Sequence, residues 1–207
     1  MKDLKFSIFD LFSYSLPGGI ALIAFLFMGS EMNNLEELAN KASKINIGFG
    51  IGILLVFTSY IIGNAIDSIG SWIYVKIGIK IWGNPKDNNR KISVGFQRSL
   101  VRNYSPENYI YIQKWKVVKT MSHNLSFSFL LLGIIVIIKM IMNEESRNLH
   151  IIILTLISFL FSLIFLNRAH IFDRWHYKDL TNVVDSLHLQ EKAIKDSKKV
   201  DNEKKTT

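Results

Sequence analysis

The residues best able to do chemistry in this chain follow its last apolar block. His170, Asp173 and His176 are spaced by three residues, which places their side chains on one side of a helix. Imidazole and carboxylate groups in such an arrangement are ligands for zinc or iron. The simpler explanation is the end of a membrane helix, where polar aromatic and basic residues gather at the interface with water. We therefore assign no metal ligand and no cofactor.

Two acids, Asp10 and Asp67, border the apolar blocks of the sequence. A proton relay or a proton-driven pump needs an ionisable group well inside a membrane span, and none of the blocks contains a charged residue. The chain also lacks cysteine, a Walker lysine loop and an H-E-x-x-H motif. The sequence therefore predicts a protein without enzymatic activity, and an integral-membrane enzyme is the third-ranked alternative.

The elements that position these residues are four uncharged, apolar blocks, at residues 11–30, 45–66, 120–138 and 148–167. At about 1.5 Å per helical residue, each block is long enough to cross a hydrocarbon layer roughly 30 Å thick. Four helices of this kind in so short a chain cannot bury one another in water. The sequence predicts an all-α fold, an integral membrane four-helix bundle with cytoplasmic helical extensions.

The basic residues predict the orientation of the chain in a bacterial inner membrane. Of the Lys and Arg residues, 21 lie in the N-terminal segment, the central loop and the C-terminal tail, and 4 lie in the other two connections. Because basic loops stay in the cytoplasm, both termini are predicted to be cytoplasmic. The net charge of +8 then reflects topology and attraction to anionic lipid headgroups, so nucleic acid is not an expected partner.

These patterns divide the chain into predicted segments. An interfacial amphipathic segment covers residues 1–16, and the spans cover residues 8–30, 45–66, 120–142 and 148–167. A basic cytoplasmic loop with helices covers residues 67–119, a cytoplasmic helix covers 168–194, and a disordered tail covers 195–207. Pro17 lies inside the first span and predicts a kink there, which is either an ordinary proline kink or a hinge.

The second span and its continuation carry a stripe of small and polar residues. The members of this stripe are Gly48, Gly52, Ser59, Gly63, Asn64, Asp67 and Ser71. Gly48 and Gly52 form a G-x-x-x-G pattern, which lets helix backbones approach closely in lipid. Polar groups exposed to hydrocarbon are costly, so we expect the stripe to face either a neighbouring helix or the water of a pore.

The beginning of the chain resembles a known group of proteins. The residues that carry the resemblance are Phe9-Asp10, Tyr14, Leu16-Pro17-Gly18 and Gly63. This pattern is similar to that of small four-helix bacterial membrane proteins thought to act as effectors in phage-defence operons. The resemblance covers the N-terminal third of the chain and implies a role at the membrane. It supplies no catalytic residues.

Two functions follow as hypotheses. The first is a pore-forming or membrane-disrupting effector, which acts as a homo-oligomer in bacterial antiviral defence and responds to a cytoplasmic protein or a small ligand. The stripe of the second span would then line the pore or the contact between subunits. The second is a membrane anchor or scaffold, whose basic loop and tail recruit a cytoplasmic partner and whose stripe serves only for packing.

Overall fold

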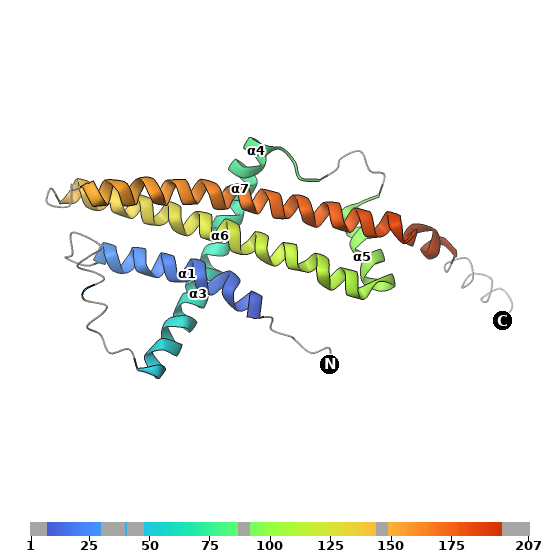
Figure 1. Cartoon of the computed structure of the whole chain (residues 1–207), viewed down its shortest axis with the longest axis horizontal. Coiled ribbons are helices and arrows are strands. Elements are labelled where there is room, and N and C mark those ends of the chain that lie inside the picture. The colour runs from blue at the N-terminus through green and yellow to red at the C-terminus, as the bar shows by residue number, and fades with distance from the viewer. Residues whose placement is uncertain (1–7, 30–39, 41–47, 87–91, 144–148, 196–207) are drawn as a thin grey trace. The chain divides into compact units, whose positions relative to one another are not determined.

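The computed structural model describes residues 8–29, 40, 48–86, 92–143 and 149–195 of the chain. All regular structure within these residues is helical. The helices are α1 Ile8–Gly29, α3 Phe49–Ile73, η1 Tyr74–Gly78, α4 Ile79–Trp82, α5 Val94–Tyr104, α6 Pro106–Met142 and α7 Leu149–Ser186 (Figure 1). The segment η1 is a π-helix that continues α3 into α4 without a break. The predicted all-α class is confirmed.

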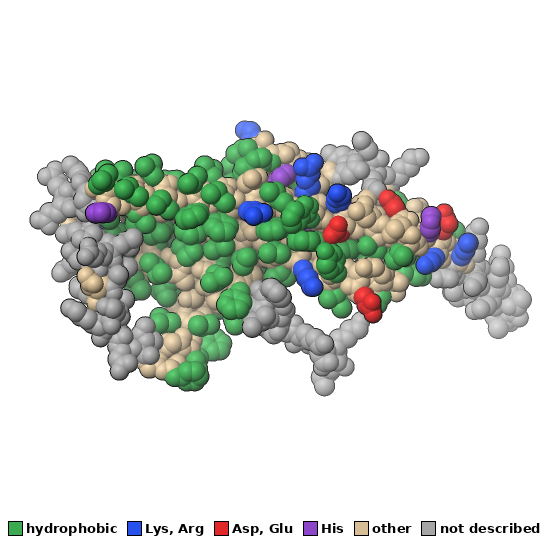
Figure 2. Space-filling view, in the orientation of Figure 1, with side chains coloured by type: hydrophobic (Ala, Val, Ile, Leu, Met, Phe, Trp, Pro, Cys, Tyr) green, Lys and Arg blue, Asp and Glu red, His purple; other side chains and the backbone are tan. Residues whose placement is uncertain are grey.

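Within the described part of the chain, four helical stretches are long and apolar enough to cross a membrane: Leu11–Gly29, Phe49–Trp82, Pro106–Met142 and Leu149–Ser186. Many of their large hydrophobic side chains are exposed, as expected for helices that contact lipid. In Figure 2 hydrophobic side chains cover the visible face over the second half of α6 and the first half of α7. The chain is therefore a multi-pass membrane protein.

The helices form two compact units. The first, here the transmembrane unit, comprises Met1–Gly83 and Val117–His170. The second, here the extension unit, comprises Asn84–Lys116 and Ile171–Thr207. The long helices α6 and α7 each contribute residues to both units.

The transmembrane unit has an apolar core where α1 packs against α6 and α7. The buried residues of this core are Ala24, Phe27, Leu132, Ile135, Val136 and Ile151. At the end of α1 the ammonium group of Lys139 donates a hydrogen bond of 2.7 Å to the carbonyl oxygen of Phe27. A cation at this position complements the partial negative charge of a helix C-terminus. This contact ties the end of α1 to α6.

The helix α3 crosses α1 at a contact between backbones, and Figure 1 shows it running across α1 rather than along it. A Cβ atom on Gly18 of α1 would fall on the carbonyl oxygen of Ser59 and 2.6 Å from the nitrogen of Gly63. A Cβ atom on Gly63 would in turn fall on the carbonyl oxygen of Tyr14. Glycine is therefore required on both helices for this close approach.

The extension unit has a core of its own. Its buried residues are Leu100, Val101, Ile112, Leu180, Val184 and Leu189, from α5, α6, α7 and the residues after α7. Ser93 caps α5, because its hydroxyl oxygen accepts a hydrogen bond of 3.3 Å from the backbone N–H of Phe96.

Several predicted segments compare directly with the helices. The span predicted at residues 8–30 corresponds to α1, which begins at Ile8 and contains Pro17. The helix predicted at residues 168–194 is interrupted by a turn at 187–188, where His188 has a φ of 48°. The turn brings Leu189 into the core of the extension unit. Residues 1–7 of the predicted interfacial segment and residues 196–207 of the predicted tail lie outside the described residues.

Candidate functional site

The small and polar stripe predicted on the second span does not form one continuous surface. Ser59 and Gly63 are buried, and they contact the backbone of α1. Gly48 is exposed, and a Cβ atom there would meet no atom within 4 Å. Gly52 is half-buried, and Asn64 is exposed. The middle of the stripe therefore packs against protein, as the packing alternative requires.

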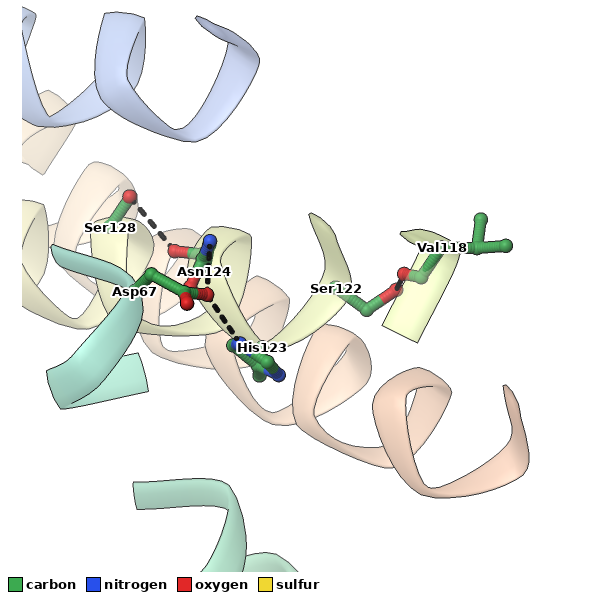
Figure 3. Close-up of polar contacts among 6 residues, drawn as sticks. All are labelled: Asp67, Val118, Ser122, His123, Asn124 and Ser128. Carbon is green, nitrogen blue, oxygen red and sulfur yellow. Dashed lines mark hydrogen bonds and ion pairs between the residues drawn. The ribbon is translucent and has the colours of Figure 1, made fainter. Parts of the chain in front are cut away.

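Asp67, at the polar end of the stripe, forms a site that connects α3 to α6. The Nε2 atom of His123 lies 3.0 Å from the Oδ1 atom of Asp67. The amide nitrogen of Asn124 donates a second hydrogen bond, also of 3.0 Å, to the same oxygen. Figure 3 shows both side chains reaching from α6 toward the carboxylate on α3. Asp67, His123 and Asn124 are called the acid–imidazole site below.

The acid–imidazole site is shielded on its α6 side and open on its α3 side. The side chain of His123 is 4% exposed, whereas that of Asp67 is 35% exposed. Asn124 is fully buried. A hydrogen bond to a carboxylate is stronger inside a protein than in water, because the surroundings screen the charge less. The site therefore places a partly accessible acid against a buried imidazole.

The neighbouring turns of α3 bring the two helices close enough for these bonds. A Cβ atom on Gly70 would lie 2.8 Å from the Oδ1 atom of Asn124 and 3.0 Å from the carbonyl oxygen of His123. One turn later the π-helix begins at Tyr74, whose buried ring stacks on the ring of His123 with centroids 6.3 Å apart. π-helical turns within α-helices are frequent at functional sites.

Two polar atoms of the site have no hydrogen-bond partner among the described residues. They are Nδ1 of His123 and Oδ1 of Asn124, and both atoms are buried. Because Asp67 accepts a hydrogen bond from His123, we assign the imidazole proton to Nε2. The Nδ1 atom then presents a lone pair to the protein interior. Unpartnered buried polar atoms are uncommon and often accompany a functional role.

Buried serines extend the polar character of the contact between α6 and α7. The hydroxyl oxygens of Ser126 and Ser162 lie 3.4 Å apart. The hydroxyl of Ser128 donates to the backbone carbonyl oxygen of Asn124 at 2.9 Å, a bond within α6. Ser158 is buried one turn before Ser162 on α7. The spanning helices thus hold polar side chains along their mutual contact.

The residues considered as metal ligands have other roles. The ring of His170 lies against Trp82 in the transmembrane unit, with centroids 6.1 Å apart. In the extension unit Nδ1 of His176 lies 3.3 Å from the carbonyl oxygen of Ile112, and Nε2 lies 3.3 Å from the Arg98 guanidinium. The part of the chain that the structure describes contains no group of three or more His, Cys, Asp or Glu arranged to hold a metal ion.

Sequence reasoning singled out Asp67 but missed its partners. His123 and Asn124 lie in the third apolar block, which was treated as uncharged because neither residue carries a permanent charge. The sequence signal for these partners was the run Ser122-His123-Asn124 at the beginning of a membrane span, where polar side chains are energetically unfavourable. Their hydrogen bonds to Asp67 could not be predicted without knowing that α3 contacts α6 at these residues.

Comparison of this chain with protein-family models, with curated proteins and with solved structures finds no match.

Proposed function

We propose that this multi-pass membrane protein is an effector that conducts ions across the bilayer. One observation carries the proposal: Asp67, His123 and Asn124 form a hydrogen-bonded, largely buried site within helices that are apolar enough to cross a membrane. Ionisable side chains inside membrane helices are costly, and they typically mark ion pathways and proton relays. Ser126 and Ser162 place two further buried hydroxyl groups between α6 and α7.

Conduction requires a rearrangement of the contact between α3 and α6. The polar side chains bond to one another and to backbone carbonyls, and Gly70 lets the two helices approach within contact distance. Separation of α3 from α6 would hydrate the acid–imidazole site and open a polar path. We expect the closed arrangement to be the resting state of the protein.

A homo-oligomer is the form that we propose for the conducting state. The first turns of α3 are exposed, with Phe49 at 87% and Leu54 at 65%, and Gly48 has open space around it. Gly48 and Gly52 can seat the backbone of a helix from a second copy. Several copies arranged in this way would surround a wider path than one chain can enclose.

The cellular setting belongs to the same proposal. The excess of basic residues in the central loop and tail favours an orientation with both termini in the cytoplasm. The resemblance to bacterial membrane proteins favours a bacterial inner membrane. The extension unit would then meet a cytoplasmic trigger, either a protein or a small ligand. The resemblance of the N-terminal third to effectors of phage-defence operons favours a role in antiviral defence, in which ion leakage stops the growth of an infected cell.

Ion flux through the purified chain tests the proposal. The full chain is reconstituted in liposomes loaded with potassium or chloride indicators, and the same chain is expressed in bacteria stained with a dye for membrane potential. We expect ion flux in liposomes and depolarisation in cells, and Gly70→Leu should alter both by disturbing the contact between α3 and α6. If the chain causes no ion flux in liposomes and no depolarisation in cells, conduction is excluded.

A membrane anchor or scaffold is the second candidate, and one observation favours it. The extension unit has its own apolar core and carries partly exposed aromatic residues, including Tyr111 at 50% and Trp175 at 40%. Such side chains are common in protein interfaces. A scaffold would bind a cytoplasmic protein through the extension unit and would show no ion flux, so the liposome experiment separates the two candidates.

A further inference from the structure

We infer that the ion handled by the acid–imidazole site is the proton, and that the imidazole of His123 relays it between the protein interior and Asp67. The inference rests on the proposed ion conduction and names the ion and its carrier. It starts from an asymmetry in exposure. The side chain of Asp67 is 35% exposed and can exchange protons with water, whereas that of His123 is 4% exposed.

The two ring nitrogens of His123 have different surroundings. Nε2 lies 3.0 Å from the Asp67 carboxylate, which is within the range for direct proton transfer. Nδ1 is buried and has no hydrogen-bond partner in the described part of the chain. A neutral imidazole with a donated N–H on one side and a lone pair on the other can accept a proton at one nitrogen while releasing one from the other.

The relay step balances in protons and charge. When α3 separates from α6 and water enters the site, a hydronium ion gives a proton to Nδ1, and the ring becomes an imidazolium. The bond between Nε2 and its hydrogen then breaks, and that proton passes to the Oδ1 atom of Asp67. The products are a neutral imidazole with its proton on Nδ1 and a neutral carboxyl group. Asp67 releases its proton to water, and no electrons are transferred. A flip of the imidazole ring then turns the Nδ1–H toward Asp67 and the lone pair of Nε2 toward the interior, where Nε2 accepts the next proton.

The groups around the imidazole come from α3, α6 and η1. The Asp67 carboxylate on α3 stabilises the imidazolium, and Asn124 holds that carboxylate in place. The Tyr74 ring of η1 stacks on the imidazole, and the Lys119 ammonium lies 4.9 Å from the centroid of the same Tyr74 ring.

The substitution His123→Gln tests the relay. Glutamine keeps an amide donor for Asp67 but cannot accept a proton at one atom and release it from another. The full chain is reconstituted with a pH-sensitive dye inside liposomes, and a potassium gradient with valinomycin sets the membrane potential. We expect proton flux to fall by at least about tenfold in this variant.

Two further variants make the result specific. Asp67→Asn retains a carbonyl oxygen that accepts hydrogen bonds, but it cannot take up a proton, so its proton flux should fall as well. His170→Gln changes another buried histidine of the transmembrane unit, and its proton flux should match that of the unsubstituted chain. Melting temperature and gel filtration in detergent establish that each variant is folded. If His123→Gln does not fold, Asp67→Asn decides the question.

The outcomes separate the relay from the proposed function. Proton flux that is lost in each folded variant of His123→Gln and Asp67→Asn, and preserved in His170→Gln, supports the relay. Unchanged proton flux in folded His123→Gln or Asp67→Asn would overturn the relay, and continued potassium or chloride flux would leave the proposed conduction intact. A chain that conducts no ion in either liposomes or cells would remove the proposed function, and the relay with it.

Discussion

At the scale of single residues, the glycines of this chain divide into two kinds. Gly18, Gly63 and Gly70 lie where two helix backbones meet, and none of them has room for a Cβ atom. Gly48 and Gly50 lie in open space on the first turn of α3. Glycine lowers the stability of a helix interior, so its presence at the crossings is explained by the close approach that it permits.

The two kinds of glycine should respond differently to alanine. Gly63→Ala places a methyl group on the carbonyl oxygen of Tyr14, and we expect it to lower the free energy of unfolding by at least about 2 kcal/mol. Gly50→Ala on the same helix meets no atom and should leave stability within about 1 kcal/mol of the original. Unfolding in mixed detergent micelles measures both. Equal effects would contradict the crossing of α1 and α3.

The close packing at Gly63 limits what a substitution there can show about the stripe. A bulky residue at Gly63 disrupts packing within one chain, so loss of activity in such a variant does not separate a pore from a scaffold. The acid–imidazole site is the better target, because Asp67→Asn and His123→Gln change chemistry while keeping approximate size. In the proposed conduction these side chains carry the chemistry, and Gly70 lets α3 approach α6 closely enough for them to meet.

At the scale of elements, α3 serves two purposes along its length. From Ser59 onward it carries the buried residues Ser59, Gly63, Ile66, Gly70 and Ile73, which face the rest of the transmembrane unit. Its first turns are exposed. The π-helix η1 then places Tyr74 and Gly78 on the buried side, and Tyr74 covers His123.

The exposed half of α3 is the element that we expect between subunits. Gly48→Leu would fill the open space at the G-x-x-x-G pattern and prevent close approach of a second copy. Crosslinking in membranes should show fewer oligomers for Gly48→Leu than for the original chain. The control Leu54→Ile keeps an exposed apolar side chain on the same helix, and its oligomers should persist. Equal crosslinking of Gly48→Leu and the original chain would place the contact elsewhere.

The extension unit depends on the cap of α5. Ser93→Ala removes the hydroxyl oxygen that accepts the N–H of Phe96, and we expect a loss of about 1 kcal/mol in the free energy of unfolding. Ser93→Asp retains an acceptor at the N-cap and should preserve stability. Denaturation followed by tryptophan fluorescence, in a chain with Trp72 and Trp82 replaced by Phe, reports on this unit, because the remaining Trp115 and Trp175 belong to it. No difference between the two variants would show that the cap contributes little.

At the scale of the whole molecule, the orientation in the membrane remains a prediction from charge. The chain has no cysteine, so a single introduced cysteine can be labelled without background. Asn108→Cys, on the exposed first turns of α6, should be protected from an impermeant maleimide in intact spheroplasts and labelled after lysis. Ser146→Cys, between α6 and α7, should be labelled in both. The reverse pattern would invert the proposed topology.

Much of the fold follows from local sequence. The uncharged block at residues 120–138 and the helix start at Ser105-Pro106-Glu107 together predict a long helix, and α6 runs from Pro106 to Met142. The residues after Asp67 likewise predict a helix that reaches Trp82, where α4 ends. The conversion of this segment into a π-helix at Tyr74 was not predicted, because it depends on packing against neighbouring residues.

The sequence by itself determined that this chain has four apolar helices able to cross a membrane, since the length of an apolar run and the distribution of charge are local properties. Only the tertiary structure decided what the polar residues of those helices contact. Asp67 and His123 are separated by 56 positions along the chain, and nothing in the sequence near either residue specifies the other. Their contact exists because Gly70 lets α3 approach α6, and α3 therefore meets protein along that face.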